Sequence, residues 1–464
     1  MSPTFDLKNK RVLVVGLARS GVGAACLAVR HGATVVAADQ RAEKDLGEAA
    51  RTLQALGVKL VCGPHDPKVF NDCELMVVSP GVPLALPEIE RARQAGVKVI
   101  GEVELASRFL TAPLIGITGT NGKSTTTALA GCLCEKAGHR TFAGGNLGRP
   151  LSDAAMAMPA ANWEYIVCEL SSFQLEGIDT LRPRVACVTN LTPDHIDRYR
   201  SHQAYGAAKK RIFMNQTAQD LGVVNARDPA TVAMLQGERC RAYSFGFGKP
   251  APRAARWDGK AIHLDVGQGP ESYLLRNKAL RGDHNVDNAM LAVLAVRLAG
   301  VAADKIQQGL DLFPGLAHRI ESAGVVNGVE YINDSKGTNV DSTIVALKAF
   351  KNIWLIAGGR GKGAPYEPMV QAGVGRVKCV LTIGEDAPKV HAAYQGRALV
   401  IDCGDLARAV KTAQEYASPG DVVLLSPACA SYDQFKNFEE RGERFKSLVQ
   451  ALPASAGSTS LGRP

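Results

Sequence analysis

The sequence lacks several features that mark other classes of protein. No apolar run reaches the roughly 18 residues that a membrane span needs. The N-terminal apolar burst at 12–15 is too short for a signal-peptide core, so we expect a cytoplasmic protein. The 11 cysteines include no Cys-x-x-Cys pair, and neither HExxH nor a zinc-site spacing of histidines occurs. We therefore expect reduced cysteines and no zinc centre.

The charged residues also lack a pattern that marks nucleic-acid-binding proteins. No Lys/Arg run is interleaved with aromatic residues as in a nucleic-acid-binding arm. Lys and Arg number 54 against 45 Asp and Glu, a net charge of +9, which suits anionic ligands such as nucleotides. A basic surface that is merely solvated explains this excess equally well. With 46% hydrophobic and 21% charged residues, the composition excludes disorder for most of the chain.

The order of apolar segments indicates the fold class. Strand-like runs alternate with helical stretches along 464 residues, which predicts an α/β protein of about three domains with largely parallel sheets. We place the domains at 1–106, 107–314 and 315–464, with a disordered Gly/Pro-rich tail from about 453. The expected strands are Arg11–Val15, Thr34–Ala38, Leu75–Val78, Leu114–Thr118, Tyr165–Leu170, Val185–Leu191, Val329–Ile332, Ile353–Ala357, Val380–Ile383 and Val422–Leu425.

The sharpest motif is TGTNGKSTTT, which begins at Thr118. It is a shortened variant of the phosphate-binding loop, because Ile117 stands where the general pattern has its first glycine. Glycines let backbone N–H groups close around a polyphosphate, Lys123 supplies positive charge, and the Ser124 hydroxyl can bind Mg²⁺. The motif therefore predicts binding of a nucleoside triphosphate.

The N-terminal turn is a weaker signal for a nucleotide. Gly16, Gly21 and Gly23 permit a tight turn after the first strand, but Ala18 replaces a glycine of the dinucleotide pattern. Asp39 ends the second strand, where a carboxylate can accept hydrogen bonds from a sugar hydroxyl. A dinucleotide, a mononucleotide or no ligand at all remain open from this turn alone.

Polar residues at the ends of later strands are further candidates. Glu169 lies in an otherwise apolar strand, where a carboxylate is costly unless it is paired or binds a metal. An Asp-His-x-Asp cluster around His195 follows the next strand, at the edge where open α/β sheets bind ligands. Lys209 on the following helix is, taken alone, an ordinary solvated lysine. Three polar strand-to-helix turns in the third section, beginning at Asp334, Gly358 and Ser426, suggest a binding edge.

Together these segments resemble the Mur ligases, a family of ATP-dependent amide-bond synthetases of peptidoglycan assembly. The resemblance runs from Lys10 to about Leu452 and rests on motifs in the family's order: TGTNGKST, ELSSFQLE, NLTPDHIDRY, AAKKRIF, GDHNVDNA, HRIE, NDSKGTN, GGRGKG and SPACASYDQFKNFEERG. Within the family, ELSSFQLE and the last motif resemble those of the members whose acceptor is D-glutamate. The Asp-Asn-Pro-Arg motif of the sibling that adds a diamino acid is absent.

The resemblance implies a fold and an activity. It implies a Rossmann-like domain for UDP, a central P-loop ATPase-type domain and a Rossmann-like C-terminal domain that closes over the centre. It implies ligation of D-glutamate through an acyl phosphate, with ATP and two Mg²⁺ ions. We expect a monomer whose partners are small-molecule substrates, and which binds neither nucleic acid nor a membrane.

The resemblance also implies roles for matching residues. ATP would contact Gly119, Thr120, Asn121, Gly122, Lys123, Ser124, Thr125, Asn285, Asn288 and Arg319. The catalytic set would be Lys123, Glu169, His195 and Lys209. The metal ligands would be Ser124, Glu169, His195 and Lys209, the lysine carrying a carbamate. The UDP-substrate would meet Ser20, Asp39, Arg41, Gly81 and Asn146, while the role of Gln40 stays open. D-Glutamate would meet Lys336, Thr338, Lys362, Ser431 and Phe438.

Several alternatives compete with this interpretation. A sister ligase or a folylpolyglutamate-synthase-like enzyme would share the phosphate loop, although no pterin-specific feature is found and the N-terminal nucleotide domain argues against the latter. A GTPase-type switch needs an Asn-Lys-x-Asp motif, whereas Asn277-Lys278 continues with Ala-Leu. An NAD dehydrogenase is disfavoured by Ala18 and by the ATP loop.

Overall fold

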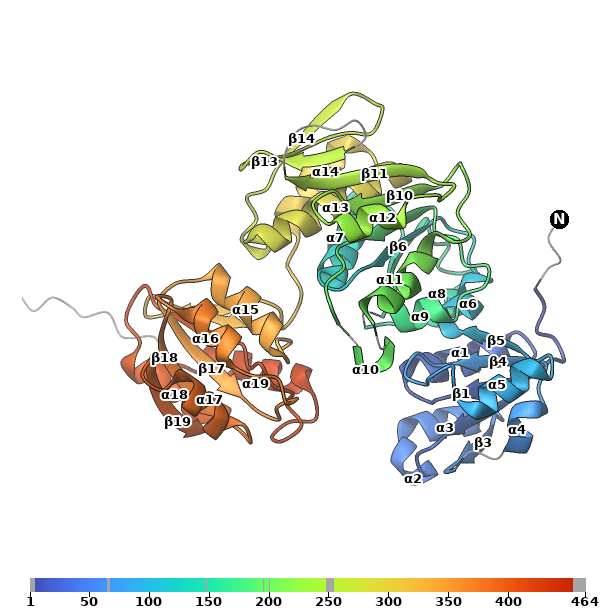
Figure 1. Ribbon diagram of the computed structural model, residues 1–464, viewed down its shortest axis with the longest axis horizontal. Coiled ribbons are helices and arrows are strands. Elements are labelled where there is room, and N and C mark those ends of the chain that lie inside the picture. The colour runs from blue at the N-terminus through green and yellow to red at the C-terminus, as the bar shows by residue number, and fades with distance from the viewer. Residues whose placement is uncertain are drawn as a thin grey trace, which may run out of the picture. The chain divides into compact units, whose positions relative to one another are not determined.

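The computed structural model describes residues 5–64, 67–146, 148–194, 196–199, 201–247 and 254–453. These fall into two compact units, 1–313 and 314–464, each of which is described by itself (Figure 1). None of the helices in this described part of the chain is long and apolar enough to cross a bilayer.

A parallel sheet opens the first unit. Its strands lie in the order β3-β2-β1-β4-β5 and are β1 (Arg11–Val15), β2 (Thr34–Asp39), β3 (Lys59–Cys62), β4 (Leu75–Val78) and β5 (Lys98–Gly101). The helices are α1 (Arg19–Arg30), α2 (Glu43–Leu46), α3 (Glu48–Ala55), α4 (Pro67–Asn71), α5 (Pro87–Gln94) and α6 (Glu102–Ser107). The strand order reverses beside β1, so the turn after β1 lies at a switch point where such sheets bind ligands.

A larger sheet follows in the same unit, in the order β14-β13-β12-β11-β10-β9-β6-β8-β7. Its strands are β6 (Leu114–Thr118), β7 (Thr141–Gly145), β8 (Tyr165–Glu169), β9 (Val185–Val188), β10 (Leu221–Asn225), β11 (Arg241–Phe247), β12 (Ala254–Trp257), β13 (Ala261–Asp265) and β14 (Pro270–Leu274). Pairing is parallel from β7 to β12 and antiparallel in the last two steps. The antiparallel strands and the edge strand β7 were not expected from the sequence.

Helices surround this second sheet. They are α7 (Lys123–Lys136), α8 (Leu151–Met156), α9 (Ser172–Glu176), α10 (Ile196–Tyr199), α11 (His202–Lys210), α12 (Pro229–Met234), α13 (Asp283–Ala299) and α14 (Ala303–Leu312), with short 3-10 turns at Arg211–Phe213 and Lys278–Leu280. Helix α13 is apolar on nearly every side, and its residues from Ala289 to Val296 are all buried. A helix without a polar face must lie in the core, and α13 packs there against α7.

The second unit contains a six-stranded sheet in the order β15-β16-β20-β17-β18-β19. Its strands are β15 (Glu321–Val326), β16 (Val329–Asn333), β17 (Ile353–Gly358), β18 (Val377–Ile383), β19 (Leu399–Gly404) and β20 (Val422–Leu425). Its helices are α15 (Val340–Ala349), α16 (Glu367–Gly373), α17 (Ala387–Tyr394), α18 (Leu406–Tyr416) and α19 (Phe438–Gln450). Only the β15–β16 pair is antiparallel among these strands. The tail predicted from about 453 lies almost wholly outside the described residues.

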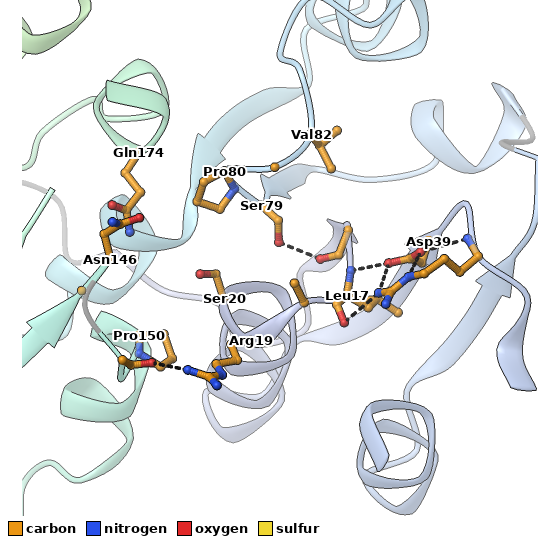
Figure 2. A pocket seen from close by; sticks show the side chains of 16 residues that line it. Leu17, Arg19, Ser20, Asp39, Ser79, Pro80, Val82, Asn146, Pro150 and Gln174 are labelled. Atoms are coloured by element: carbon orange, nitrogen blue, oxygen red, sulfur yellow. Dashed lines mark hydrogen bonds and ion pairs between the residues drawn. The ribbon is translucent and has the colours of Figure 1, made fainter. Parts of the chain in front are cut away.

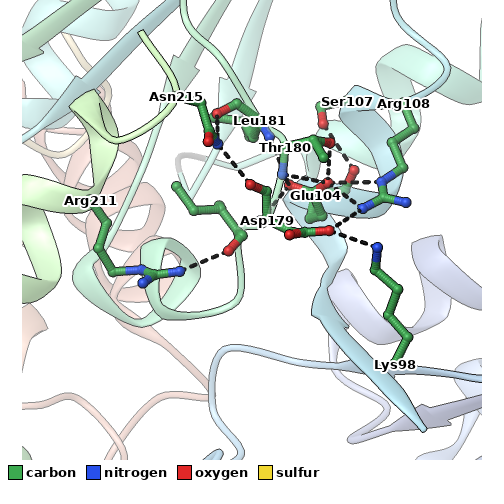
Figure 3. A network of polar contacts seen from close by, with 10 residues as sticks. Lys98, Glu104, Ser107, Arg108, Asp179, Thr180, Leu181, Arg211 and Asn215 are labelled. Carbon is green, nitrogen blue, oxygen red and sulfur yellow. Dashed lines mark hydrogen bonds and ion pairs between the residues drawn. The ribbon is translucent and has the colours of Figure 1, made fainter. Parts of the chain in front are cut away.

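A buried carboxylate joins the first two sheets of unit 1. The Glu104 side chain on α6 is 0% exposed and accepts hydrogen bonds from the backbone N–H groups of Asp179, Thr180 and Leu181, at 2.9–3.1 Å. Arg108, one turn further along α6, pairs with the same carboxylate at 2.7 Å. Figure 3 shows Glu104 at the centre of this network. The bonds hold its pKa below the ordinary value although burial acts in the opposite direction.

This network predicts a large stability effect for Glu104→Gln. The amide would place a donor against backbone donors and would remove the charge that pairs with Arg108. Breaking a buried pair by changing one partner costs about 3–5 kcal/mol, so the urea midpoint should fall markedly. The control is Glu90→Gln, which removes a surface pair with Arg93 and should change stability by about 0.5 kcal/mol or less. Equal midpoints for both variants would show that the network contributes little.

Candidate functional site

The predicted phosphate loop joins β6 to α7. Strand β6 ends at Thr118 and α7 begins at Lys123, so four residues make the turn. Gly119 and Gly122 have φ of +138° and +84°, values that side chains rarely adopt. A Cβ at Gly119 would lie 1.9 Å from Thr189 Oγ1, and one at Gly122 would lie 2.2 Å from Asn288 Oδ1. Both glycines are therefore required by conformation and by space.

The residues after β9 hold this loop from one side. We expected the strand to run to Leu191, but β9 ends at Val188. The chain leaves the ladder because its next residues bind the loop instead: Thr189 Oγ1 donates to the Asn121 carbonyl at 2.6 Å, and Asn190 Oδ1 accepts from Asn121 N–H at 2.9 Å. The Thr120 N–H also donates to the Asn190 carbonyl. The expected boundary was wrong by three residues for this reason.

Helix α13 brings two predicted ATP contacts to the other side of the loop. Asn288 Oδ1 accepts a hydrogen bond from Thr126 Oγ1 at 3.3 Å, and its Nδ2 donates to Asn285 Oδ1 at 3.2 Å. Both asparagines are buried. Predicted contacts 160 residues further along the chain thus lie beside the loop. Arg319, the third such residue, belongs to the second unit, where its Nε is buried without a hydrogen-bond partner among the described residues.

Lys209 lies at the same loop and is not the solvated lysine that its local sequence suggests. Its side chain on α11 is buried, and Nζ donates to the Gly119 carbonyl at 2.6 Å. The amine also lies 4.5 Å from the centre of the Tyr205 ring. Burial, followed by the nearby charge of Lys123, lowers the Lys209 pKa to about 6. The amine is therefore largely neutral and nucleophilic at neutral pH.

Glu169 at the end of β8 has the environment of a metal ligand. It is 2% exposed, its Oε1 accepts from Asn146 Nδ2 at 2.8 Å, and its Oε2 is buried without a hydrogen-bond partner within the described structure. A buried carboxylate oxygen left unpaired in this way fits a cation. Within the described ranges no group of three or more His, Cys, Asp and Glu could hold a metal. His195 lies outside the described residues.

A cavity of about 480 Å³ lies at the switch point of the first sheet, and Figure 2 shows its lining. All five residues predicted to meet the UDP-substrate line it: Ser20, Asp39, Arg41, Gly81 and Asn146. They come from the first turn of α1, the end of β2 and the turn that follows it, the loop after β4 and the residue after β7. Gln40, whose role was left open, is exposed and is not part of this lining. A volume of this size is typical of small-molecule sites.

Asp39 organises the walls of this cavity. Its Oδ2 accepts from Leu17 N–H at 2.7 Å, and its Oδ1 accepts from Arg41 N–H at 2.9 Å. The Arg41 guanidinium adds bonds of 2.9 Å to both oxygens. These bonds, led by the one from the Arg41 side chain, lower the Asp39 pKa to about 2. Asp39 therefore fixes the glycine turn in addition to facing the cavity.

The residues predicted to meet D-glutamate gather within the second unit, at the carboxyl ends of β16, β17 and β20. Lys362 Nζ donates to Thr338 Oγ1 at 3.4 Å, and Lys336 Nζ lies 5.9 Å from the centre of the Phe438 ring. Ser431 follows β20 and is 2% exposed. Two lysines beside hydroxyl groups can hold a dicarboxylate.

Two contributors to these sites were missed from the sequence. Arg441 is 1% exposed and donates to the Ser335 and Cys429 carbonyls, at 2.9 and 3.2 Å, so it ties together the loops of the pocket in the second unit. Gln174 lines the cavity of the first unit and closes a capping box with Ser171. Both stand inside quoted motifs, but no local spacing distinguishes a buried arginine or a capping glutamine from surface residues.

Comparison with known proteins assigns the family. The family models "Mur ligase MurD-like, N-terminal domain", "Mur ligase middle domain" and "Mur ligase, glutamate ligase domain" match residues 10–101, 117–296 and 318–429. UDP-N-acetylmuramoylalanine--D-glutamate ligase of Myxococcus xanthus is 57% identical over 97% of this chain and 100% of its own. The chain belongs to the Mur ligase family. The ligase of the same name from Anaeromyxobacter dehalogenans is 54% identical over 96% of this chain and 98% of its own.

Solved structures agree with this assignment at the level of the fold. The pseudomurein peptide ligase type C of Methanothermus fervidus is 19% identical to this chain with a TM-score of 0.59, and the match covers 95% of this chain and 99% of its own. The expectation of three α/β domains is confirmed, with N-terminal, middle and C-terminal domains each built on its own sheet.

Proposed function

We propose that this Mur ligase joins D-glutamate to UDP-N-acetylmuramoyl-L-alanine at the expense of ATP, in the cytoplasmic synthesis of peptidoglycan precursors. The observation that carries the proposal is 57% identity to a ligase of that name over 97% of this chain. The proposed domain boundaries are 1–106, 107–314 and 315–464, and the proposed active form is a monomer.

In the first step the alanyl carboxylate attacks the γ-phosphorus of ATP, which forms a C–O–P bond and releases ADP. All the groups involved are anionic, so positive charge and in-line positioning do most of the work. Residues 119–125 would cradle the phosphates with backbone N–H groups and the Lys123 ammonium. Asn285, Asn288 and Arg319 would contact the nucleoside and its phosphates.

In the second step the amine of D-glutamate attacks the acyl carbon. The new C–N bond forms as inorganic phosphate leaves, and the amine loses a proton. Lys336 and Lys362 would bind the two carboxylates of the acceptor, with Thr338, Ser431 and Phe438 completing the pocket. Arg441 would hold the two loops in place through its bonds to main-chain carbonyls.

Two Mg²⁺ ions would add positive charge beside the triphosphate. Ser124 and Glu169 would hold one ion, and the unpaired Glu169 Oε2 supports this role. His195 and a carbamate on Lys209 would hold the other, and the lowered pKa of Lys209 favours reaction of its neutral amine with CO₂. Ser20, Asp39, Arg41, Gly81 and Asn146 would bind the UDP-substrate in the cavity that they line.

The test is phosphate release from ATP in the presence of UDP-N-acetylmuramoyl-L-alanine and Mg²⁺. Parallel reactions contain D-glutamate, L-glutamate, L-alanine, D-alanine, a diamino acid or no acceptor. Release that requires both Mg²⁺ and D-glutamate is the expected result. Release with another amino acid would make the chain a sister ligase. If a folded, ATP-binding protein released no phosphate with any of these acceptors, the proposed activity would be overturned.

A further inference from the structure

The cavity of the first unit carries an uncompensated positive charge. Its charged lining residues are Arg19, Asp39 and Arg41. Arg41 and Asp39 neutralise each other, since the guanidinium makes two hydrogen bonds of 2.9 Å to the carboxylate. The remaining formal charge of +1 therefore belongs to Arg19, a residue to which neither the motifs nor the family resemblance gave a role.

Arg19 reaches from one wall of the cavity to the other. It is the first residue of α1, and its Nη1 donates to the carbonyl of Gly148, in the loop between β7 and α8, at 3.2 Å. Figure 2 shows its side chain pointing toward the segment that carries Pro150. Within the ranges that the structure describes, no carboxylate forms an ion pair with Arg19, and its side chain is exposed. A guanidinium has five N–H donors, so the bond to Gly148 leaves several for a ligand.

The chemistry of the guanidinium selects among the parts of a nucleotide ligand. Its planar, forked donors match phosphate oxygens in pairs and keep their charge at every physiological pH. A uracil ring and a ribose are neutral, so neither compensates a cation. The diphosphate of the UDP-substrate does.

We propose that Arg19 binds the diphosphate of the UDP-substrate while it bridges the two walls of the cavity. This inference rests on the proposed function, because that function brings the UDP-substrate to this cavity. Arg19 is thus a binding residue for the diphosphate, while Asp39 and Arg41, which neutralise each other, line the same cavity and also fix the turn.

The same helix offers a matched control. Arg30, at the other end of α1, also donates from its guanidinium to main-chain carbonyls, those of Met156 at the end of α8 and of Met158 just after it. It is exposed but is not part of the cavity lining. Arg30→Gln therefore removes a comparable bridge between the same two parts of the chain and leaves the charge of the cavity unchanged.

The experiment measures the affinity of the full chain for UDP and for uridine by calorimetry. The variants are Arg19→Gln, Arg19→Lys and Arg30→Gln. The Arg19→Gln variant loses charge-assisted hydrogen bonds to phosphate. It should therefore bind UDP about 10- to 100-fold more weakly than the wild type and bind uridine equally well. The UDP affinity of Arg19→Lys should lie between those of the wild type and Arg19→Gln, because lysine keeps the charge but lacks the forked donors of the guanidinium. KM for UDP-N-acetylmuramoyl-L-alanine should rise in parallel, with KM for ATP unchanged.

Three results would overturn the inference, and they differ from failure of the proposed function. Equal losses for UDP and uridine in Arg19→Gln would place Arg19 at the nucleoside. Equal losses in Arg19→Gln and Arg30→Gln would make it only a bridge. Unchanged UDP affinity in Arg19→Gln would leave the proposed function standing without this residue. If the wild-type chain bound neither UDP nor uridine, the proposed function itself would fail.

Discussion

Replacing Lys123 by alanine should abolish ATP-dependent ligation and leave the protein folded. The Lys123 side chain is half-buried at the start of α7, and its Nζ donates to the Thr120 carbonyl at 2.7 Å. In the proposed reaction this ammonium lies against phosphate oxygens whose charge redistributes in the transition state. Removing one such positioned donor costs about 10²- to 10³-fold in kcat, and the loss of a full charge should cost at least that.

The measurement is phosphate release together with circular dichroism and the thermal midpoint. Lys136→Ala is the control, because Lys136 is exposed at the other end of the same helix. That variant should retain most of the activity, while Lys123→Ala should lose it at an unchanged midpoint. A Lys123→Ala enzyme with near-normal turnover would refute the assignment of this loop.

The second large effect is expected at Lys209. Lys209→Ala should be inactive and should regain activity when acetate or formate is added, since a carbamate serves to present an anion. Carbamate formation needs a neutral amine, and burial lowers the Lys209 pKa to about 6. Removing CO₂ and bicarbonate from the wild-type enzyme should likewise reduce its activity, most strongly above about pH 6, where the amine is neutral and can form the carbamate.

Lys210→Ala provides the matched control. Lys210 is the next residue on α11, is 41% exposed, and pairs with Glu238 at 3.2 Å. Its loss should leave activity nearly unchanged and insensitive to acetate. Lys209 would be an ordinary buried lysine if CO₂ removal did not change the activity of the wild type and added carboxylate did not change the activity of Lys209→Ala.

The same pKa shift makes a separate prediction about stability. A lysine whose pKa falls on folding penalises the folded state below its unfolded pKa, near 10.5, and the penalty grows until the pH reaches about 6. In protein kept free of CO₂ and Mg²⁺, Lys209→Met should therefore raise the thermal midpoint at pH 7 although the variant is inactive. The gain should shrink toward pH 10, and a midpoint gain independent of pH would contradict this account.

Local signals in the sequence were sufficient for the elements that carry the site. The apolar run at β6, the two glycines and the Gly-Lys-Ser step predict a strand, a turn and a helix, and these occur where expected. The β1 and β4 strands likewise have the predicted bounds. These signals work because strand burial, positive φ and helix initiation depend on neighbouring residues.

Local signals failed where another part of the chain supplied the deciding contact. The expected strand to Leu191 stops at Val188 because Thr189 and Asn190 bind the phosphate loop. The hairpin strands β13 and β14 have weak patterns of their own, and they pair at the edge of a sheet whose register is set by distant strands. In the sequence nothing distinguishes Arg19 from a surface arginine, because its contact with the Gly148 carbonyl forms only in the folded chain.

The sequence by itself determined the α/β class, the three sections, the phosphate loop and, through the order of its motifs, the family. Tertiary structure alone decided the state of particular groups: the neutral amine of Lys209, the unpaired oxygen of Glu169 and the charge left on Arg19. The physical reason is that burial and pairing set the energy of a charge, and both depend on residues far away in the chain. Residue type and spacing, by contrast, are properties of the chain before it folds.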